Sequence, residues 1–419
     1  MFVTIAQKLV AKIVKICGNK RNNKKNNKNN KKMKKYIYIF SIATLLVVSL
    51  VIGCKKDTES DTITDNGTGN SAKYSTAVAL EILYGQLLQP NFGNIKLVNG
   101  DILKFESAEH YEQVYESLNN LYEAWTTLFI QTYDTGDEDA LDAKIEQLKF
   151  DDNLPLLRFA EKYKTKLLIN DIALMEEAWL NEGGSAKSPS NPITNCPIEQ
   201  TLLSIYYEFC IGDTICQLRP EGYQILIPTS TLGSLSYIRN VSVEELLSHV
   251  NKGLPNYDDP PKWPVHIPTY NVTIHSTESS TCYESKHQIN PLQYNGDNYR
   301  FEWSYHFRHQ PFWGVTKTTA TIKNYKFKNN KWKKDYGSSC RISFETKLYA
   351  EYGEYCHDRG WVAGKQSLNM KLHSRSISYP ASSWLADTPK SIRDDINDSF
   401  VECRHRGEKF EFYANGNPK

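Results

Sequence analysis

Aromatic and polar residues alternate strictly between Tyr299 and Arg308, and this pattern constrains the fold more than any other feature of the chain. Five aromatic side chains take every second position, and five polar side chains lie between them. Successive side chains of a strand point to opposite faces of its sheet. The segment therefore predicts a β-strand with an aromatic face in a core and a polar face in solvent.

Other segments of the C-terminal half repeat this alternation, at 344–348 and 368–372. Residues 325–332 predict a hairpin that turns at an Asn-Asn pair, and residues 400–413 predict a final hairpin that turns at Arg-Gly. Several short strands at this spacing are typical of an antiparallel sandwich. We therefore expect a mainly β domain over 193–419, with one short helix at 243–250.

The preceding region has a different pattern. Apolar residues recur at threes and fours over 107–133 and 155–180, which is the helical period. Residues 54–190 hold 24 acidic and 12 basic residues, and we expect most of the acids to face solvent, with an acidic binding surface as the alternative. We predict an acidic helical domain over 74–183, and a linker over 184–192 because that stretch is rich in Gly, Ser, Pro and Asn. The predicted fold class is α+β, with an N-terminal helical region followed by a mainly antiparallel, sandwich-like β region.

A signal peptide is predicted over 33–53. Lys34 and Lys35 precede an almost unbroken apolar run from Tyr36 to Leu50, and Gly53 stands just before Cys54. This layout resembles the lipobox of bacterial lipoproteins. The resemblance implies that the Cys54 thiol carries a diacylglycerol, that the chain is cut before Cys54, and that the new amino group is acylated.

Residues 54–73 are polar, as a flexible tether requires. The alternative for the apolar run is an uncleaved signal anchor. Residues 1–32 do not fit a signal peptide. We interpret them as the product of a misassigned start codon, because the signal peptide begins at Met33. The alternative is a basic amphipathic segment at a membrane surface.

Charge and hydropathy exclude two classes of protein. Residues 1–53 hold twelve basic and no acidic residues, which leaves 38 basic and 48 acidic residues in the rest of the chain. That balance argues against a nucleic-acid binder. A second apolar stretch of spanning length is missing from the sequence, which argues against a polytopic membrane protein.

Residues 55–59 resemble, in part, the export signals of Bacteroidota lipoproteins, so we expect a lipid anchor in the outer membrane at the cell surface, with the periplasmic face as the alternative.

Seven cysteines follow Cys54, all of them in the predicted β domain. Disulfides are the default in an exported protein, and Cys210 and Cys216 flank a Gly-Asp turn that could bring them together. The other pairings stay open, and an odd count leaves at least one thiol unpaired. Zinc is the rival use for Cys356-His357 and for Cys403 with His405, but the spacing does not fit, so we expect no metal and no cofactor.

Motifs that would indicate catalysis are not recognisable. Cys356-His357-Asp358 are adjacent in the chain, whereas a nucleophile and its base usually meet across a fold, and His306 and His309 would point to opposite faces of a strand. One basic cluster stands out. It comprises Lys326, Lys328, Lys331, Lys333 and Lys334. It predicts either protection of a sheet edge or a patch for an anionic glycan.

Three short segments resemble uncharacterised Bacteroidota lipoproteins: 100–107, 211–227 and the Lys331-Trp332 pair. The resemblance implies kinship of fold and no activity. Our functional prediction is a membrane-anchored cell-envelope lipoprotein that acts as a non-enzymatic binding module, with a glycan or an envelope protein as partner. The alternatives are a surface hydrolase that acts on glycan or peptide, and a structural envelope protein.

Overall fold

The alternating segment 299–308 lies within β10 (Tyr299–Gln310) of a computed structural model. The structure describes residues 71–249, 265–276, 288–310, 315–352, 355–380 and 391–419. The predicted leader, signal peptide and lipidation site at Cys54 lie outside the described residues, as do Cys282 and the side chains of Cys356, His357, Asp358 and His309. The part described belongs to one compact unit.

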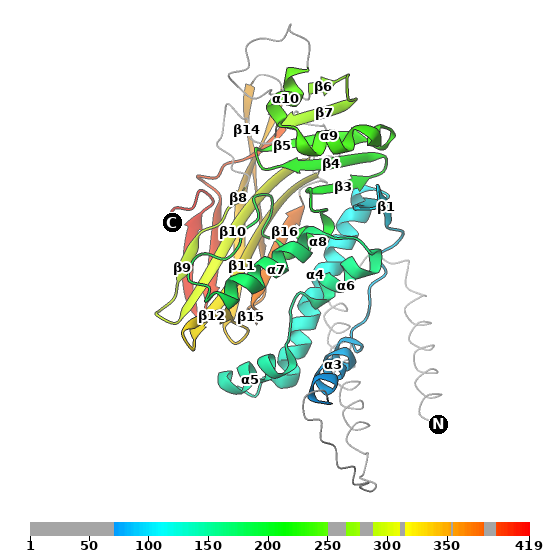
Figure 1. Cartoon of the computed structure of the whole chain (residues 1–419). Helices are drawn as coiled ribbons and strands as arrows, with labels where there is room; N and C mark the ends of the chain where they lie inside the picture. Colours follow the sequence, from blue (N-terminus) through cyan, green and yellow to red (C-terminus); the bar gives the residue numbers. More distant parts are fainter. Residues whose placement is uncertain (1–70, 250–264, 277–287, 311–314, 353–354, 381–390) are drawn as a thin grey trace, which may run out of the picture. The chain divides into compact units, whose positions relative to one another are not determined.

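Eight α-helices lie in the described residues, most of them before the β region, as the predicted fold class requires (Figure 1). They are α3 (Ser71–Tyr84), α4 (Ala108–Tyr133), α5 (Glu138–Leu148), α6 (Leu154–Tyr163), α7 (Leu168–Asn181), α8 (Pro197–Leu202), α9 (Leu235–Asn240) and α10 (Val243–Ser248). A 3₁₀ segment precedes α9 at Thr229–Ser234. The short helix predicted at 243–250 is confirmed.

Seven strands form the first sheet, in the order β1-β2-β3-β4-β5-β7-β6. Their bounds are β1 (Lys96–Val98), β2 (Ile102–Phe105), β3 (Glu208–Ile211), β4 (Thr214–Arg219), β5 (Tyr223–Pro228), β6 (Val265–Ile267) and β7 (Val272–Ser276). Strands β2 and β3 are parallel, and the other pairs are antiparallel. This sheet therefore combines strands from both sides of the predicted 184–192 linker.

The region 74–183, predicted as an acidic helical domain, also contains a β-hairpin formed by β1 and β2. Asn99 and Gly100 turn the chain with φ angles of 54° and 79°. Strand β2 was missed because Ile102, Leu103 and Phe105 are all buried, so the strand shows no alternation of apolar and polar residues.

Two six-stranded sheets contain the remaining strands. The second sheet contains β8 (Gln288–Ile289), β9 (Leu292–Tyr294), β10, β11 (Val315–Lys328), β12 (Lys331–Lys334) and β16 (Ser374–Pro380). The third sheet contains β13 (Ser339–Tyr352), β14 (Tyr355–Gln366), β15 (Met370–Lys371), β17 (Ser391–Asp394), β18 (Phe400–His405) and β19 (Glu408–Tyr413). Both predicted hairpins are confirmed, as β11–β12 and β18–β19.

The second and third sheets pack face to face around an aromatic core. Phe301, Trp303 and Tyr305 of β10 join Phe344 of β13 and Phe412 of β19 in one buried cluster. The rings of Trp303 and Phe412 stack with centroids 4.9 Å apart. Alternation puts these side chains on one face of each strand, so the predicted sandwich is confirmed.

The polar face of β10 is buried as well, which the alternation did not predict. Arg300, Glu302, His306 and Arg308 are all at most 3% exposed. They lie beneath the N-terminal region: Arg308 donates to Glu199 of α8, and Ser188 donates through its backbone to Glu302 at 2.9 Å. The expectation of a wet face was wrong because Ser188 and α8 supply polar partners for it.

Candidate functional site

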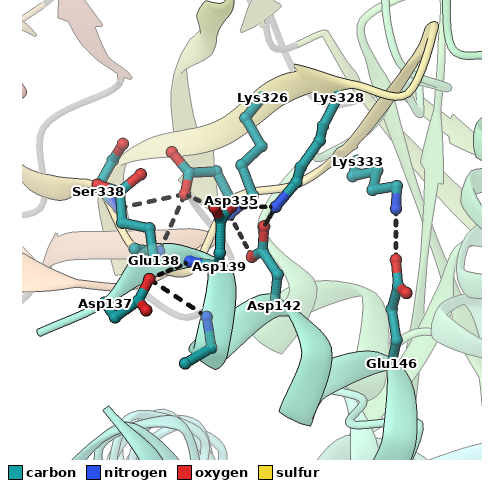
Figure 2. Close-up of polar contacts among 12 residues, drawn as sticks. Asp137, Glu138, Asp139, Asp142, Glu146, Lys326, Lys328, Lys333, Asp335 and Ser338 are labelled. Atoms are coloured by element: carbon teal, nitrogen blue, oxygen red, sulfur yellow. Dashed lines mark hydrogen bonds and ion pairs between the residues drawn. The ribbon is translucent and has the colours of Figure 1, made fainter. Parts of the chain in front are cut away.

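The predicted lysine cluster lies on the β11–β12 hairpin, and its side chains meet acids of the helical region (Figure 2). Asn329 and Asn330 form the turn with φ angles of 56° and 61°. Lys328 donates to Asp139 at 2.5 Å and to Asp142 at 2.9 Å, both of them on α5.

Two further lysines of the hairpin bind the same helix. Lys326 pairs with Asp142, and Lys333 pairs with Glu146 one turn further along α5 (Figure 2). The hydrogen bond from Lys333 lowers the pKa of Glu146, and the hydrogen bonds that Lys328 donates to Asp139 and Asp142 raise the pKa of Lys328. Lys334 pairs with Asp152 at 2.9 Å, so four of the five lysines of the predicted anionic-ligand patch are paired within the chain, and the fifth, Lys331, is exposed.

Glu176 of α7 is the centre of a buried cluster between the helices and the second sheet. It accepts from Lys323 at 3.1 Å and from the Tyr325 hydroxyl at 2.9 Å, and Lys334 lies 3.1 Å from its other oxygen. Burial alone would raise the pKa of Glu176, but Lys323, Lys334 and His373 hold it well below its usual range. The cluster joins α7 to β11, β12 and the start of β16.

Glu199 of α8 makes a second buried cluster. Arg308 donates to it at 3.3 Å, and Thr319 donates to its other oxygen at 3.3 Å. Burial would raise the pKa of Glu199, but Arg308 and His306 hold it well below its usual range. The expectation that the acids of 54–190 face solvent is wrong for Glu176, which is buried against the sheet. Glu199 lies beyond that range and binds the sheet as well.

Cys210 and Cys216 do not form the predicted disulfide. In the β3–β4 pair, Cys210 is opposite Ile215 and Cys216 is opposite Phe209, so the two side chains point to opposite faces of the sheet. Each is a buried free thiol, and burial raises the pKa to about 11 for Cys210 and to about 12 for Cys216. Cys196, Cys340 and Cys403, the other described cysteines, are free and buried too. Within the part of the chain that the structure describes, acidic, Cys and His side chains form no group of three that could hold a metal.

A polar cavity that the sequence did not indicate opens on the described surface. It measures about 210 Å³ and lies between α4, the end of β14 and β16. Its lining is mostly polar and includes Glu116, Asn119, Asn120, Lys365, Arg375 and Ser378. Binding pockets for drug-sized ligands begin at about 300 Å³, so this cavity fits a smaller polar group.

Two ion pairs along α4 frame the cavity. Glu112, towards the start of the helix, pairs with Lys317 at 3.5 Å. Glu123, two turns after Glu116, pairs with Arg375 at 3.3 Å. The Arg375 guanidinium also donates to the backbone carbonyl of Leu368 at 3.3 Å. The first pair joins α4 to β11, and the second joins α4 to β16.

The α4 side chains between the two ion pairs are open to a ligand. Glu116, Asn119 and Asn120 share one helix face because they are three and four residues apart. None of these three side chains makes a hydrogen bond or ion pair with another described residue, and Glu116 and Asn119 are only half-buried. Opposite them, Arg375 is 5% exposed, and its Nε atom has no hydrogen-bond partner. Three polar side chains of α4, with Asn120 exposed, therefore line the cavity without a partner among the described residues.

Comparisons with known proteins give little for this chain. No family model matches it, and neither does any curated protein. It is similar to the crystal structure of a DUF4848 family protein from Bacteroides thetaiotaomicron VPI-5482, at 13% identity over 75% of this chain and 95% of that one. The TM-score is 0.15, so the likeness carries no argument about fold or function.

Within the described residues, no helix combines the length and the apolar character needed to cross a membrane.

Proposed function

We propose that this chain is a lipid-anchored cell-envelope protein whose described part is a non-enzymatic binding module, with the polar cavity as its ligand site. One observation carries the proposal: Glu116, Asn119 and Asn120 have no partner among the described residues, yet they face a cavity framed by two ion pairs. Elsewhere between the helices and the second sheet, the acids are paired within the chain. Glu116 and Asn119 are half-buried and Asn120 is exposed, so these side chains are open to a ligand that enters the cavity.

The membrane anchor rests on the sequence around Cys54, with the signal-like segment before it and the polar tether after it. Several acyl chains would anchor the protein firmly, because each buried methylene contributes about 0.8 kcal/mol. Replacing Cys54 by Ala should abolish labelling with a fatty-acid probe and release the protein from the membrane fraction. Labelling that persists in the variant would contradict the anchor.

The side of the outer membrane is tested separately, by protease treatment of intact cells and detection of the 193–419 region. We expect digestion, which would make capture of extracellular glycans the leading use of the cavity. Digestion only after the outer membrane is opened would instead place the domain in the periplasm and favour an envelope partner.

Binding is distinguished from hydrolysis by one experiment on the mature protein. The protein is passed over immobilised polysaccharides and peptides, and the soluble phase is analysed for products. Retention without products supports a binding module. Products formed from polysaccharide or peptide would favour the hydrolase alternative.

A further inference from the structure

The cavity chemistry allows the ligand class to be named, if the cavity is the binding site as proposed above. We infer that it binds a single neutral sugar residue, recognised by hydrogen bonds to its hydroxyl groups. A hydroxyl group both donates and accepts, and the cavity supplies an acceptor in Glu116 and amides in Asn119 and Asn120 that both donate and accept.

The charges around the cavity favour a neutral ligand. Glu116 is an unpaired acid, and Lys365 is a base whose ammonium donates to the Ser378 carbonyl at 2.9 Å. The remaining acid and base of the lining, Glu123 and Arg375, neutralise each other at 3.3 Å. An anion would meet the Glu116 carboxylate, and a cation would meet two basic side chains.

A free amino acid is also neutral overall, but the cavity lacks the clamp that its carboxylate would need. Carboxylates are held best by two parallel hydrogen bonds from one arginine. Both terminal nitrogens of Arg375 are already engaged, one with the Leu368 carbonyl and one with Glu123. The buried Nε atom has no accessible surface through which a ligand could reach it.

The cavity also indicates how the sugar lies. Tyr115 lines its base, but the Lys317 ammonium lies 3.1 Å from the centre of that ring and occupies its face. Stacking on the ring is therefore blocked. Leu368 is 75% exposed at the rim and can cover the apolar C–H face of a sugar. Recognition by hydrogen bonds with one exposed apolar contact predicts weak affinity, with dissociation constants between about 1 μM and 1 mM.

The test measures binding of methyl glycosides of glucose, galactose, mannose and N-acetylglucosamine to the full mature protein by ligand-observed NMR. We expect at least one to bind, with an affinity that does not change between low and high salt. Glu116→Gln replaces a charged acceptor by a neutral one, and because hydrogen bonds to charged groups are the stronger, we expect binding to weaken by about tenfold. Glu109→Gln is the matched control, because Glu109 is exposed on the same helix outside the cavity.

Asn119→Ala is the second cavity variant and should weaken binding by about tenfold. Both cavity variants should unfold at the wild-type temperature, since neither side chain has a partner in the chain. The inference is overturned if none of the glycosides binds, or if a glycoside binds and both cavity variants retain wild-type affinity. If only amino acids, peptides or anionic glycans bind, and Glu116→Gln alters that binding, the sugar inference fails while the proposed binding function stands. If no ligand of any class is retained, the proposed function fails as well.

Discussion

The two faces of β10 are buried against different partners by different chemistry. Its inner face packs aromatic rings against the third sheet, whereas its outer face joins the helices through charged side chains. Asp394 of β17 places a buried carboxyl at the inner face, where it accepts a hydrogen bond from the Tyr305 hydroxyl at 2.5 Å. The outer acids Glu176 and Glu199 are instead paired with bases.

The difference appears in the protonation of the buried acids. Burial raises the pKa of Asp394 to about 6, although hydroxyl groups of Ser399, Tyr305 and Thr346 oppose the shift. On the outer face, neighbouring bases lower the pKa of Glu176 and Glu199 despite equal burial. Burial alone thus does not set the charge of a carboxyl, because its partners decide it.

The largest loss of stability is expected at Glu176, the centre of the buried charged cluster between the helices and the outer face of the second sheet. Glu176→Gln leaves Lys323 and Lys334 buried without their shared carboxylate, and breaking a buried pair in this way costs about 3–5 kcal/mol. Urea unfolding of the variant measures the loss. Glu177→Gln is the control, since Glu177 is the exposed neighbour and should change the free energy of unfolding by less than about 0.5 kcal/mol. Equal effects of the two variants would contradict the assigned cluster.

The inner face should lose stability as the pH rises, whereas the outer face should lose stability as the pH falls. Between about pH 4 and 6 the folded protein keeps a proton on Asp394 that the unfolded chain has lost, so this contribution to stability falls as pH rises. From pH 4.5 to pH 7 the loss amounts to about 2 kcal/mol. Unfolding of wild type and Asp394→Asn at both pH values should show this difference only in the wild type.

Below about pH 4.5 the outer face should lose stability instead. The folded pKa of Glu176 and of Glu199 lies below the unfolded value, so their contribution is complete above the unfolded pKa and is lost as pH falls through the folded one. Glu176→Gln should be less sensitive to acid than wild type. A steeper loss in the variant would show that this carboxylate is not stabilised by its bases.

The rim of the outer face should contribute far less than its centre. The Lys333–Glu146 pair joins β12 to α5 with the Glu146 side chain 63% exposed (Figure 2). Exposed pairs contribute about 0.2–1 kcal/mol, so Lys333→Gln should have a small effect on unfolding by urea. A loss like that of Glu176→Gln would mean that the hairpin, and not the buried cluster, holds the helices to the sheet.

Salt should have the smallest effect, and it should weaken the exposed Lys333–Glu146 pair but not the buried pair of Tyr305 and Asp394. In 1 M salt the screening length is about 3 Å, so the coupling between Lys333 and Glu146 in a double-mutant cycle should fall towards zero. The coupling between Tyr305 and Asp394, measured with Tyr305→Phe and Asp394→Asn, should not change. Equal salt sensitivity would remove the distinction between the faces.

Local patterns in the sequence determined the elements and their order. Alternation in β10 predicts the aromatic face of the sandwich, the Asn329-Asn330 and Arg406-Gly407 turns predict the two hairpins, and helical spacing predicts α4. These features depend on the side-chain periods of strands and helices, which any single chain displays.

The tertiary structure alone decided what the polar residues face. A polar residue opposite an apolar stripe is compatible with water or with a distant partner, and the sequence does not say which. Glu176 and Lys323 are 147 residues apart, and only the packing of α7 on the second sheet brings them together. The faces of Cys210 and Cys216 depended on the β3–β4 register, and the cavity depended on the gap between two ion pairs. Long-range contacts leave no local period in a sequence, because each partner is set by the fold and not by its neighbours in the chain.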